Sequence, residues 1–396
     1  MNSMRIFAFV GLVVFLYYCL YYLYFGFLHP MPGLGDSWDY HIPISQTILQ
    51  GTFLSPVQVK LPQWYYPGSA EAINGILIFL GIPLTISNLL AVFCLFFICW
   101  KLGGVFKLSF YESLFFASTI VTLNVFVRWY NAVSVDVWLV NFFLLGIILF
   151  ERPKESLRYV LFLGFILGML IGTKLSGWYY LVMLSLIYGK SLLALMSFKK
   201  IIIFMIPFSI FGLFWYLRNL LLFANPFYPI AFLSLPMKMY FPIKISTIIV
   251  SSPKFFCDAL IAEYKVWVVV IPLAIFTSIR PIFSHTRVSS QMIKLLLLIT
   301  FSFGVFLLSP SEFQAEVVVS SLRYSYPAFI LMILLTFIVA KHYHKLEMLS
   351  ILSIASMIMV TSFLYYPKLV FIYGSLSLFV VFLLDKYQRT LERIFA

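Results

Sequence analysis

The sequence predicts an all-α integral membrane protein, a polytopic bundle of about twelve transmembrane helices. Of its 396 residues, 63% are hydrophobic and only 10% are charged, and the mean hydropathy is +1.02. Soluble globular domains are far less apolar, so that class is excluded. Long apolar runs alternate with short charged connectors, and in lipid only helices and closed barrels satisfy every backbone polar group. Barrel strands would alternate polar and apolar side chains, which these runs do not. We therefore expect a single polytopic membrane domain over residues 1–396.

The apolar runs place the expected spans. The first, 6–28, is too long for the apolar core of a signal peptide and precedes no small-residue cleavage site, so we expect a retained anchor. The expected spans cover residues 6–28, 72–100, 109–127, 136–150, 159–173, 177–196, 201–217, 265–279, 295–309, 327–340, 348–364 and 369–384.

The basic residues of the short connectors predict the orientation, because Lys and Arg favour the cytoplasmic side. With Arg5 inside, the other basic clusters fall inside as well, and the alternation holds along the chain. We expect a multi-pass protein of the plasma (inner) membrane with cytoplasmic N- and C-termini. The clusters flank spans and do not form one soluble face, so the net charge of +13 does not indicate a nucleic-acid partner.

Two long connectors fall on the expected outer face, residues 29–71 and 218–264. Both are rich in proline and aromatic residues, which suit short helices lying in the membrane interface. We expect interfacial helices in the first outer loop. We also expect the chemistry on this face, because the two loops and several boundary charges are there.

The first connector carries Asp36, Asp39, Tyr40 and His41 within six residues. A carboxylate held in such a segment can act as a general base. The alternative is that the acids cap the helix that begins near Asp39, since Asp is a favoured N-cap residue. No cofactor is required by this scheme, although the two acids and His41, together with Glu71, could supply ligands to a divalent metal.

Asp136 stands at the expected outer end of the fourth span, near Asn131. An acid at membrane depth is costly and usually faces a polar cavity or a partner, which makes Asp136 a candidate site residue. The alternative is an ion pair with nearby Arg128.

Several basic residues break the cytoplasmic bias by standing where a span meets the outer face. If the helices bundle, these cations could converge on a phosphate, with Arg as a bidentate donor and Lys as a point charge. The alternative is that each side chain reaches the interface on its own. These residues are Arg128, Lys174, Arg218 and Arg323.

The segment GDSWDYHIPISQTILQG, followed by WYYPGSAEA, resembles the first outer loop of GT-C glycosyltransferases that use polyprenyl-phosphate sugars. This class includes the protein O-mannosyltransferases and the aminoarabinose transferase of lipid A. Its members carry an acid four residues before an aromatic, then an interfacial helix and a proline-rich stretch. Asp36 and Tyr40 match that spacing, so the resemblance implies Asp36 as the catalytic base, with Asp39 in reserve.

Later segments are also similar to bacterial members of this class, in the same order and with the same outer placement, over residues 1 to 330. One departure is the replacement of a Lys-Pro-Pro sequence by Tyr-Tyr-Pro at residues 65–67, and no large soluble C-terminal domain follows. The substrate-binding residues that the resemblance implies are Tyr40, His41, Asp136, Lys174, Arg218, Asn225, Arg323 and Tyr324.

The resemblance implies an inverting transferase of the GT-C type. It would move a hexose or pentose from a polyprenyl-phosphate donor to a glycan, lipid or protein acceptor on the outer face. One alternative is a flippase or exporter of lipid-linked sugars, although such a carrier should place polar residues along a path at mid-membrane, where few occur. The other is a polysaccharide polymerase or ligase, whose functional loop usually falls late in the chain.

Overall fold

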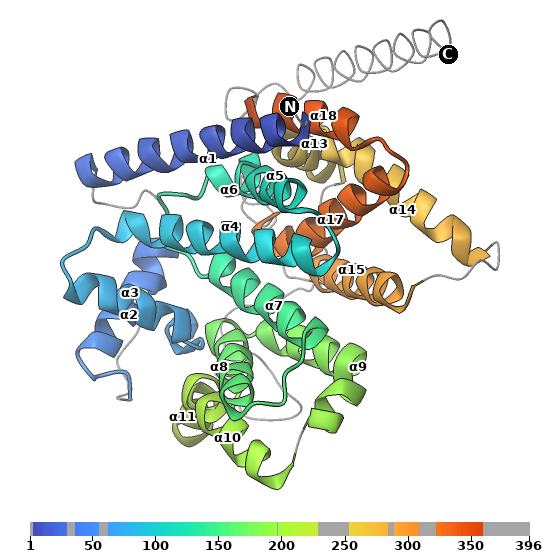
Figure 1. Cartoon of the computed structure of the whole chain (residues 1–396). Helices are drawn as coiled ribbons and strands as arrows, with labels where there is room; N and C mark the ends of the chain where they lie inside the picture. The colour runs from blue at the N-terminus through green and yellow to red at the C-terminus, as the bar shows by residue number, and fades with distance from the viewer. Residues whose placement is uncertain are drawn as a thin grey trace, which may run out of the picture. The chain divides into compact units, whose positions relative to one another are not determined.

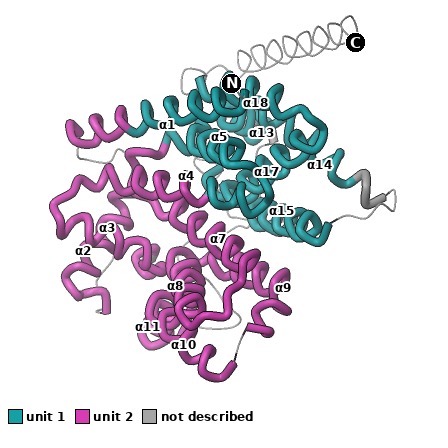
Figure 2. The backbone as a smooth tube through the Cα atoms, in the orientation of Figure 1, with its two compact units in different colours: residues 1–19, 99–128, 245–396 teal, residues 20–98, 129–244 magenta. Residues whose placement is uncertain are grey.

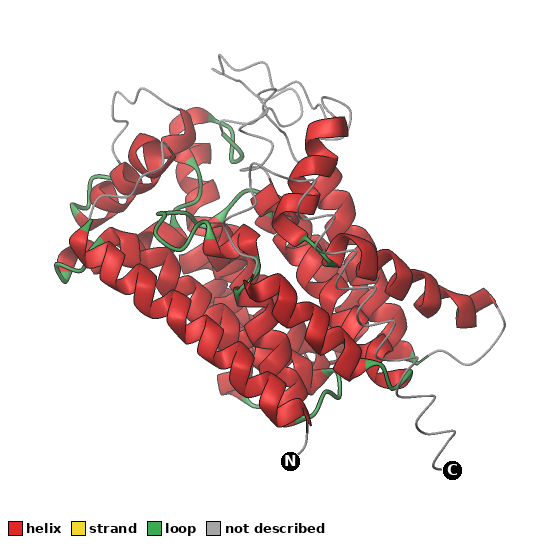
Figure 3. Cartoon of the chain, turned by 90° about the horizontal axis from the view of Figure 1, so that it is seen from above, coloured by secondary structure: helices red, strands yellow, loops and turns green. Residues whose placement is uncertain are grey.

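The described part of the chain is helical. The computed structural model describes residues 3–29, 36–54, 62–195, 197–228, 253–283, 289–308 and 322–358, which form helices and turns with no strand among them (Figure 3). Within these residues, 6 helices are long and apolar enough to cross a membrane, or 7 if one pair bent by 91° counts as a single span. The chain is therefore a multi-pass membrane protein. The expected total of about twelve spans is not confirmed, and the last expected span, 369–384, lies outside the described residues.

The helices fall into two compact units, which are drawn in teal and magenta in Figure 2. Figure 1 labels the helices along the chain, of which α1 (Ser3–Leu28) and α4 (Ser87–Val105) contribute residues to both units. Unit 1 also contains α5 (Phe110–Val121), α6 (Asn124–Val127), α13 (Pro253–Tyr264), α14 (Trp267–Phe283), α15 (Ser290–Leu308), η5 (Leu322–Ser325), α17 (Tyr326–His342) and α18 (Leu346–Ile358). Unit 2 contains η1 (Ser37–His41), α2 (Ile42–Leu49), η2 (Pro62–Tyr65), α3 (Ser69–Phe79), η3 (Leu84–Ile86), α7 (Asp136–Glu151), α8 (Leu157–Thr173), α9 (Gly177–Leu195), α10 (Phe198–Phe208), η4 (Ser209–Leu213) and α11 (Phe214–Phe223).

The core of unit 1 is the apolar helix α17, which packs against α5, α14, α15 and α18. Most of its residues are buried, as suits a helix that is hydrophobic on all sides. Polar contacts hold both of its ends. The Tyr326 hydroxyl donates to the backbone oxygen of Val125 over 2.8 Å, and Lys341 Nζ lies 2.7 Å from Glu112 Oε2.

A buried acid, Glu263, lies near the bend between α13 and α14 in unit 1. It is 1% exposed, pairs with Arg128, and accepts a hydrogen bond of 3.0 Å from Asn124 Nδ2. A buried carboxylate needs such partners, because an unpaired charge inside a protein is expensive. Arg128, one of the predicted outer cations, is therefore bound to an acid of its own unit.

The face of α8 that meets α10 and η4 carries Gly164, Gly168 and Gly172 in unit 2. A Cβ atom added at Gly168 would lie 2.9 Å from Phe208 Cα and 3.0 Å from the backbone oxygen of Pro207. Small residues let membrane helices approach until their backbones touch. Just beyond Pro207 the helix widens into the π-helical turn η4, a common place for a change of helix course.

The expected span 72–100 is wrong in its first part, because the helix is interrupted. The short helix α3 ends at Phe79, and the chain turns through Gly81, at φ +69°, and Pro83 before η3 and α4 begin. Glycine adopts this left-handed conformation at little cost, and proline cannot continue a helix. The span that fits a membrane is Leu84–Val105.

Alanine at Gly168 should destabilise the protein by about 1–3 kcal/mol, because the added methyl group meets backbone atoms of the facing helix. The thermal unfolding temperature of purified protein in detergent measures this loss. Gly189→Ala on α9 is the matched control, since a Cβ there meets nothing within 4 Å. Equal unfolding temperatures for the two variants would show that the close helix contact does not exist.

Candidate active site

The predicted catalytic segment of the first loop forms the π-helical turn η1, which is anchored inside unit 2. The Ser37 hydroxyl donates to the backbone oxygen of Val133 over 3.1 Å and accepts from the Val133 N–H over 3.2 Å. The Trp64 indole donates to the backbone oxygen of Asp39 over 2.9 Å. Two distant segments of the chain therefore fix the course of η1.

The two candidate acids have different surroundings. Asp39 lies in the middle of η1 and is exposed, whereas Asp36 directly precedes it and is half-buried. The alternative that these acids cap a helix is not supported, because Asp39 is inside the turn and Asp36 makes no capping hydrogen bond with its side chain. Of the two, Asp36 is placed nearer to the interior of the unit.

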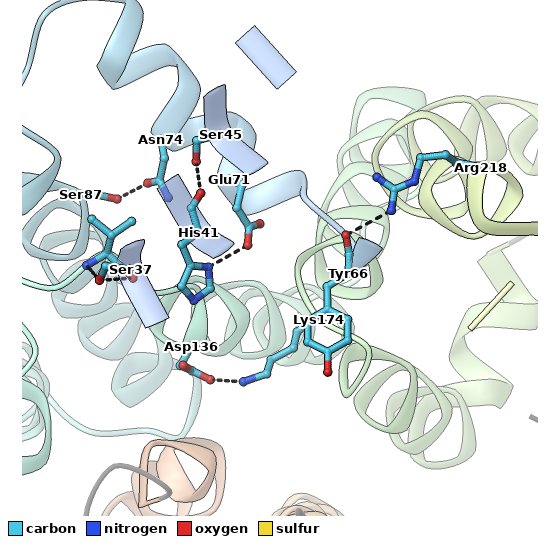
Figure 4. A network of polar contacts seen from close by, with 11 residues as sticks. Ser37, His41, Ser45, Tyr66, Glu71, Asn74, Ser87, Asp136, Lys174 and Arg218 are labelled. Atoms are coloured by element: carbon cyan, nitrogen blue, oxygen red, sulfur yellow. Dashed lines mark hydrogen bonds and ion pairs between the residues drawn. The ribbon is translucent and has the colours of Figure 1, made fainter. Parts of the chain in front are cut away.

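His41 is buried and paired with Glu71, the acid in the first turn of α3. The distance from His41 Nδ1 to Glu71 Oε1 is 3.0 Å, and each side chain is 2% exposed. The Ser45 hydroxyl donates to the backbone oxygen of His41 over 2.7 Å (Figure 4). Helix α2 packs along α3 and brings the two residues together.

Asp136 and Lys174, both predicted as substrate-binding residues, form an ion pair of 2.6 Å with side chains 5% and 21% exposed. Asp136 is the first residue of α7, and Lys174 directly follows the last residue of α8. Each charge therefore stands at the helix end whose dipole stabilises it. The alternative pairing of Asp136 with Arg128 is wrong, because Arg128 pairs with Glu263.

Arg218 and Asn219, on α11, hold the segment that leads from η2 to α3. Arg218 Nη2 donates to the backbone oxygen of Tyr65 over 2.7 Å, and Asn219 Nδ2 donates to the same oxygen over 2.9 Å. A weaker contact of 3.5 Å runs from Arg218 Nη2 to the oxygen of Tyr66. Arg218 is only 4% exposed. The alternative that its side chain reaches the membrane interface on its own is therefore wrong.

The rings of Tyr40 and Tyr66 meet edge to face, with centroids 6.3 Å apart. In Figure 4 the Tyr66 side chain points from the Arg218 contact toward Lys174. Burial raises the pKa of the neighbouring Tyr65 phenol, and nearby Tyr228 raises it further. Tyr65 and Tyr66 thus bring aromatic rings to this part of the unit.

The other predicted residues have local contacts. Asn225 follows α11, where Ala224 adopts φ +53°, and its Oδ1 accepts from the Phe227 N–H over 2.9 Å, which stabilises the turn. Arg323 and Tyr324 belong to η5 of unit 1, and the guanidinium carbon of Arg323 lies 5.5 Å from the centroid of the Tyr324 ring.

Sequence reasoning missed the partners that organise the site. Trp215, Arg218 and Asn219 follow the i, i+3, i+4 spacing of one helix face, which could have indicated that α11 has a polar side. The Trp215 indole donates to the Ser69 hydroxyl over 2.7 Å. No comparable spacing links Glu71 to its histidine, because those two residues meet only through the packing of α2 on α3.

The proposed set of divalent-metal ligands does not come together. Of Asp36, Asp39, His41 and Glu71, only the last two are in contact. Among the described residues, no group of three or more His, Cys, Asp and Glu side chains is arranged to hold a metal ion. These residues therefore do not fit a metal centre.

Comparison with known proteins identifies the fold. No protein-family model and no curated protein matches the chain. The chain is similar to the crystal structure of ArnT from Cupriavidus metallidurans in the apo state, with a TM-score of 0.54 and 13% identity over 89% of this chain and 62% of that one. It is also similar to the same protein bound to undecaprenyl phosphate, with a TM-score of 0.57 and 12% identity over 89% and 63%. The chain thus spans about three fifths of the length of ArnT and shares its fold.

Replacing Lys174 by Met should cost roughly 3 kcal/mol of stability, because it removes the ion-pair partner of the buried Asp136 carboxylate. The double variant Asp136→Leu/Lys174→Met should recover most of this loss, since no lone charge remains. Chemical or thermal unfolding of the wild type and of both variants measures the difference. A double variant less stable than Lys174→Met would contradict the buried ion pair.

Proposed function

We propose that the chain is a membrane glycosyltransferase that moves a sugar from a polyprenyl-phosphate donor to an acceptor on the outer face of the plasma membrane. The observation that carries the proposal is the position of η1. Asp36 directly precedes this turn, which folds into the same unit as the Asp136–Lys174 pair, within a fold shared with ArnT. ArnT is a lipid A aminoarabinose transferase of the GT-C class, and one of its structures contains undecaprenyl phosphate.

In the proposed reaction the acceptor hydroxyl or amine attacks the anomeric carbon of the sugar as the bond to the phosphate breaks, with inversion. Asp36 accepts the proton of the acceptor, and Asp39 is the second candidate for this base. Polyprenyl phosphate departs with the electron pair of the broken bond. Lys174 neutralises its charge, in the way that a preorganised cation stabilises charge that develops in a transition state.

Arg218 contributes to the proposed reaction indirectly. Because its guanidinium is bound to the backbone oxygens of Tyr65 and Tyr66, it orders the segment between the first loop and α3. The acceptor class and the orientation with cytoplasmic termini belong to this proposal as well. The supporting features are the resemblance of the first loop and the placement of basic clusters.

A flippase or exporter remains the alternative function, and detergent separates it from an enzyme. Purified protein in micelles has no membrane across which to move a lipid. If it releases undecaprenyl phosphate from undecaprenyl-phosphate glucose or aminoarabinose when an envelope extract supplies acceptors, transport is not its sole activity. Absence of turnover with every donor, in the presence of undecaprenyl phosphate binding, would favour the carrier.

Asp36→Asn should lower sugar transfer by about 10²–10⁴-fold, the usual contribution of a general base. Asp39→Asn should keep most of the activity, because that side chain is exposed. The measurement is release of undecaprenyl phosphate in the detergent assay, with binding of undecaprenyl phosphate itself as the control for folding. Full activity in both variants would show that neither Asp36 nor Asp39 is the catalytic base.

A further inference from the structure

The buried imidazole of His41 uses only one of its two nitrogens within the protein. Nδ1 lies 3.0 Å from Glu71 Oε1, while Nε2 has no hydrogen-bond partner among the described residues. Figure 4 shows the ring between the Glu71 carboxylate and the Asp136–Lys174 pair. The open nitrogen thus belongs to a fully buried side chain that borders the polar site.

The surrounding charges indicate which nitrogen carries the hydrogen. Asp136 is paired with Lys174 at 2.6 Å, and Glu71 and Arg218 attract each other electrostatically. A charge on the imidazole would be an additional buried charge, which is costly. A neutral imidazole has one donor and one acceptor nitrogen, and a carboxylate only accepts. Nδ1 therefore donates to Glu71, and Nε2 presents a lone pair.

Glu71 adds a second unused acceptor. Its Oε2 atom is buried and has no hydrogen-bond partner among the residues that the structure describes. Leaving a buried polar atom unsatisfied costs about 1–3 kcal/mol, so such atoms usually mark a place where a water or a ligand binds. The pair of residues offers acceptors and no free donor, which matches a ligand rich in hydroxyl groups.

We propose that His41, oriented by Glu71, accepts a hydrogen bond from a hydroxyl group of the donor sugar and determines which sugar is transferred. The inference rests on the proposed function and deepens it. A phosphate is the wrong partner for this nitrogen, because its oxygens are themselves acceptors and would face the lone pair and the Glu71 carboxylate. Lys174 is the donor suited to the phosphate. His41 is thus a specificity-determining residue, and Glu71 is its positioning residue.

A buried group built to bond a hydroxyl rejects an analogue that lacks it, because the group is then left unpaired. Such sites reach 10⁴–10⁵-fold discrimination at best, and we expect about 100-fold or more here. The probes are the undecaprenyl-phosphate sugar that the wild type uses and its monodeoxy analogues. In kcat/KM the wild type should reject one analogue far more strongly than the others.

His41→Asn separates recognition from folding. The asparagine amide can still donate to Glu71, but the atom that corresponds to Nε2 is gone. We expect the discrimination at the one sensitive hydroxyl to fall to about tenfold or less, with discrimination at the other positions unchanged. Glu71→Gln is the second variant, because its amide can donate to Nδ1 and shift the hydrogen to Nε2, which should also weaken that discrimination.

Undecaprenyl phosphate, which has no sugar, is the control ligand, and its affinity should be the same in the wild type and in His41→Asn. His29→Asn is the matched control variant, since His29 is exposed at the end of α1 and its ring contacts Phe25. Unchanged discrimination in His41→Asn, or a parallel loss of undecaprenyl phosphate binding, overturns the inference while the proposed function stands. A wild type that uses no donor overturns both.

Discussion

The backbone oxygen of Tyr65 accepts hydrogen bonds from both Arg218 and Asn219, and this shared contact sets where the first loop meets α11. In an apolar surrounding a backbone carbonyl outside a regular helix must find donors within the protein. Helix α11 supplies two of them from adjacent positions. The chain then enters α3, whose Glu71 holds His41, so the place of η1 in unit 2 follows from this contact.

Much of the fold could be predicted from composition, because lipid restricts spanning segments to helices. The ion pair between Asp136 and Lys174 could also have been predicted. An acid at the start of one helix and a base at the end of a neighbouring helix are each stabilised by the helix dipole. The break at Gly81 and Pro83 was missed, although both residues are visible. Hydropathy averages over a window and does not register a backbone turn inside an apolar run.

The details of the site depend on packing that no local pattern encodes. His41 and Glu71 are 30 residues apart, and they meet because α2 lies along α3. The sequence marked Arg218 as an outer cation, but only the structure shows that its donors serve backbone oxygens. A charge at a membrane boundary can bind a ligand, an acid or the main chain, and the choice among them is made by neighbours distant in sequence.

The glycine face of α8 has a consequence for how unit 2 can move. At Gly168 the main chains of α8 and α10 touch without a layer of side chains between them, and η4 continues the same contact at Gly172. Side-chain layers are what allow packed helices to slide, because rotamers can adjust while backbones cannot. We therefore expect this part of unit 2 to move as one block.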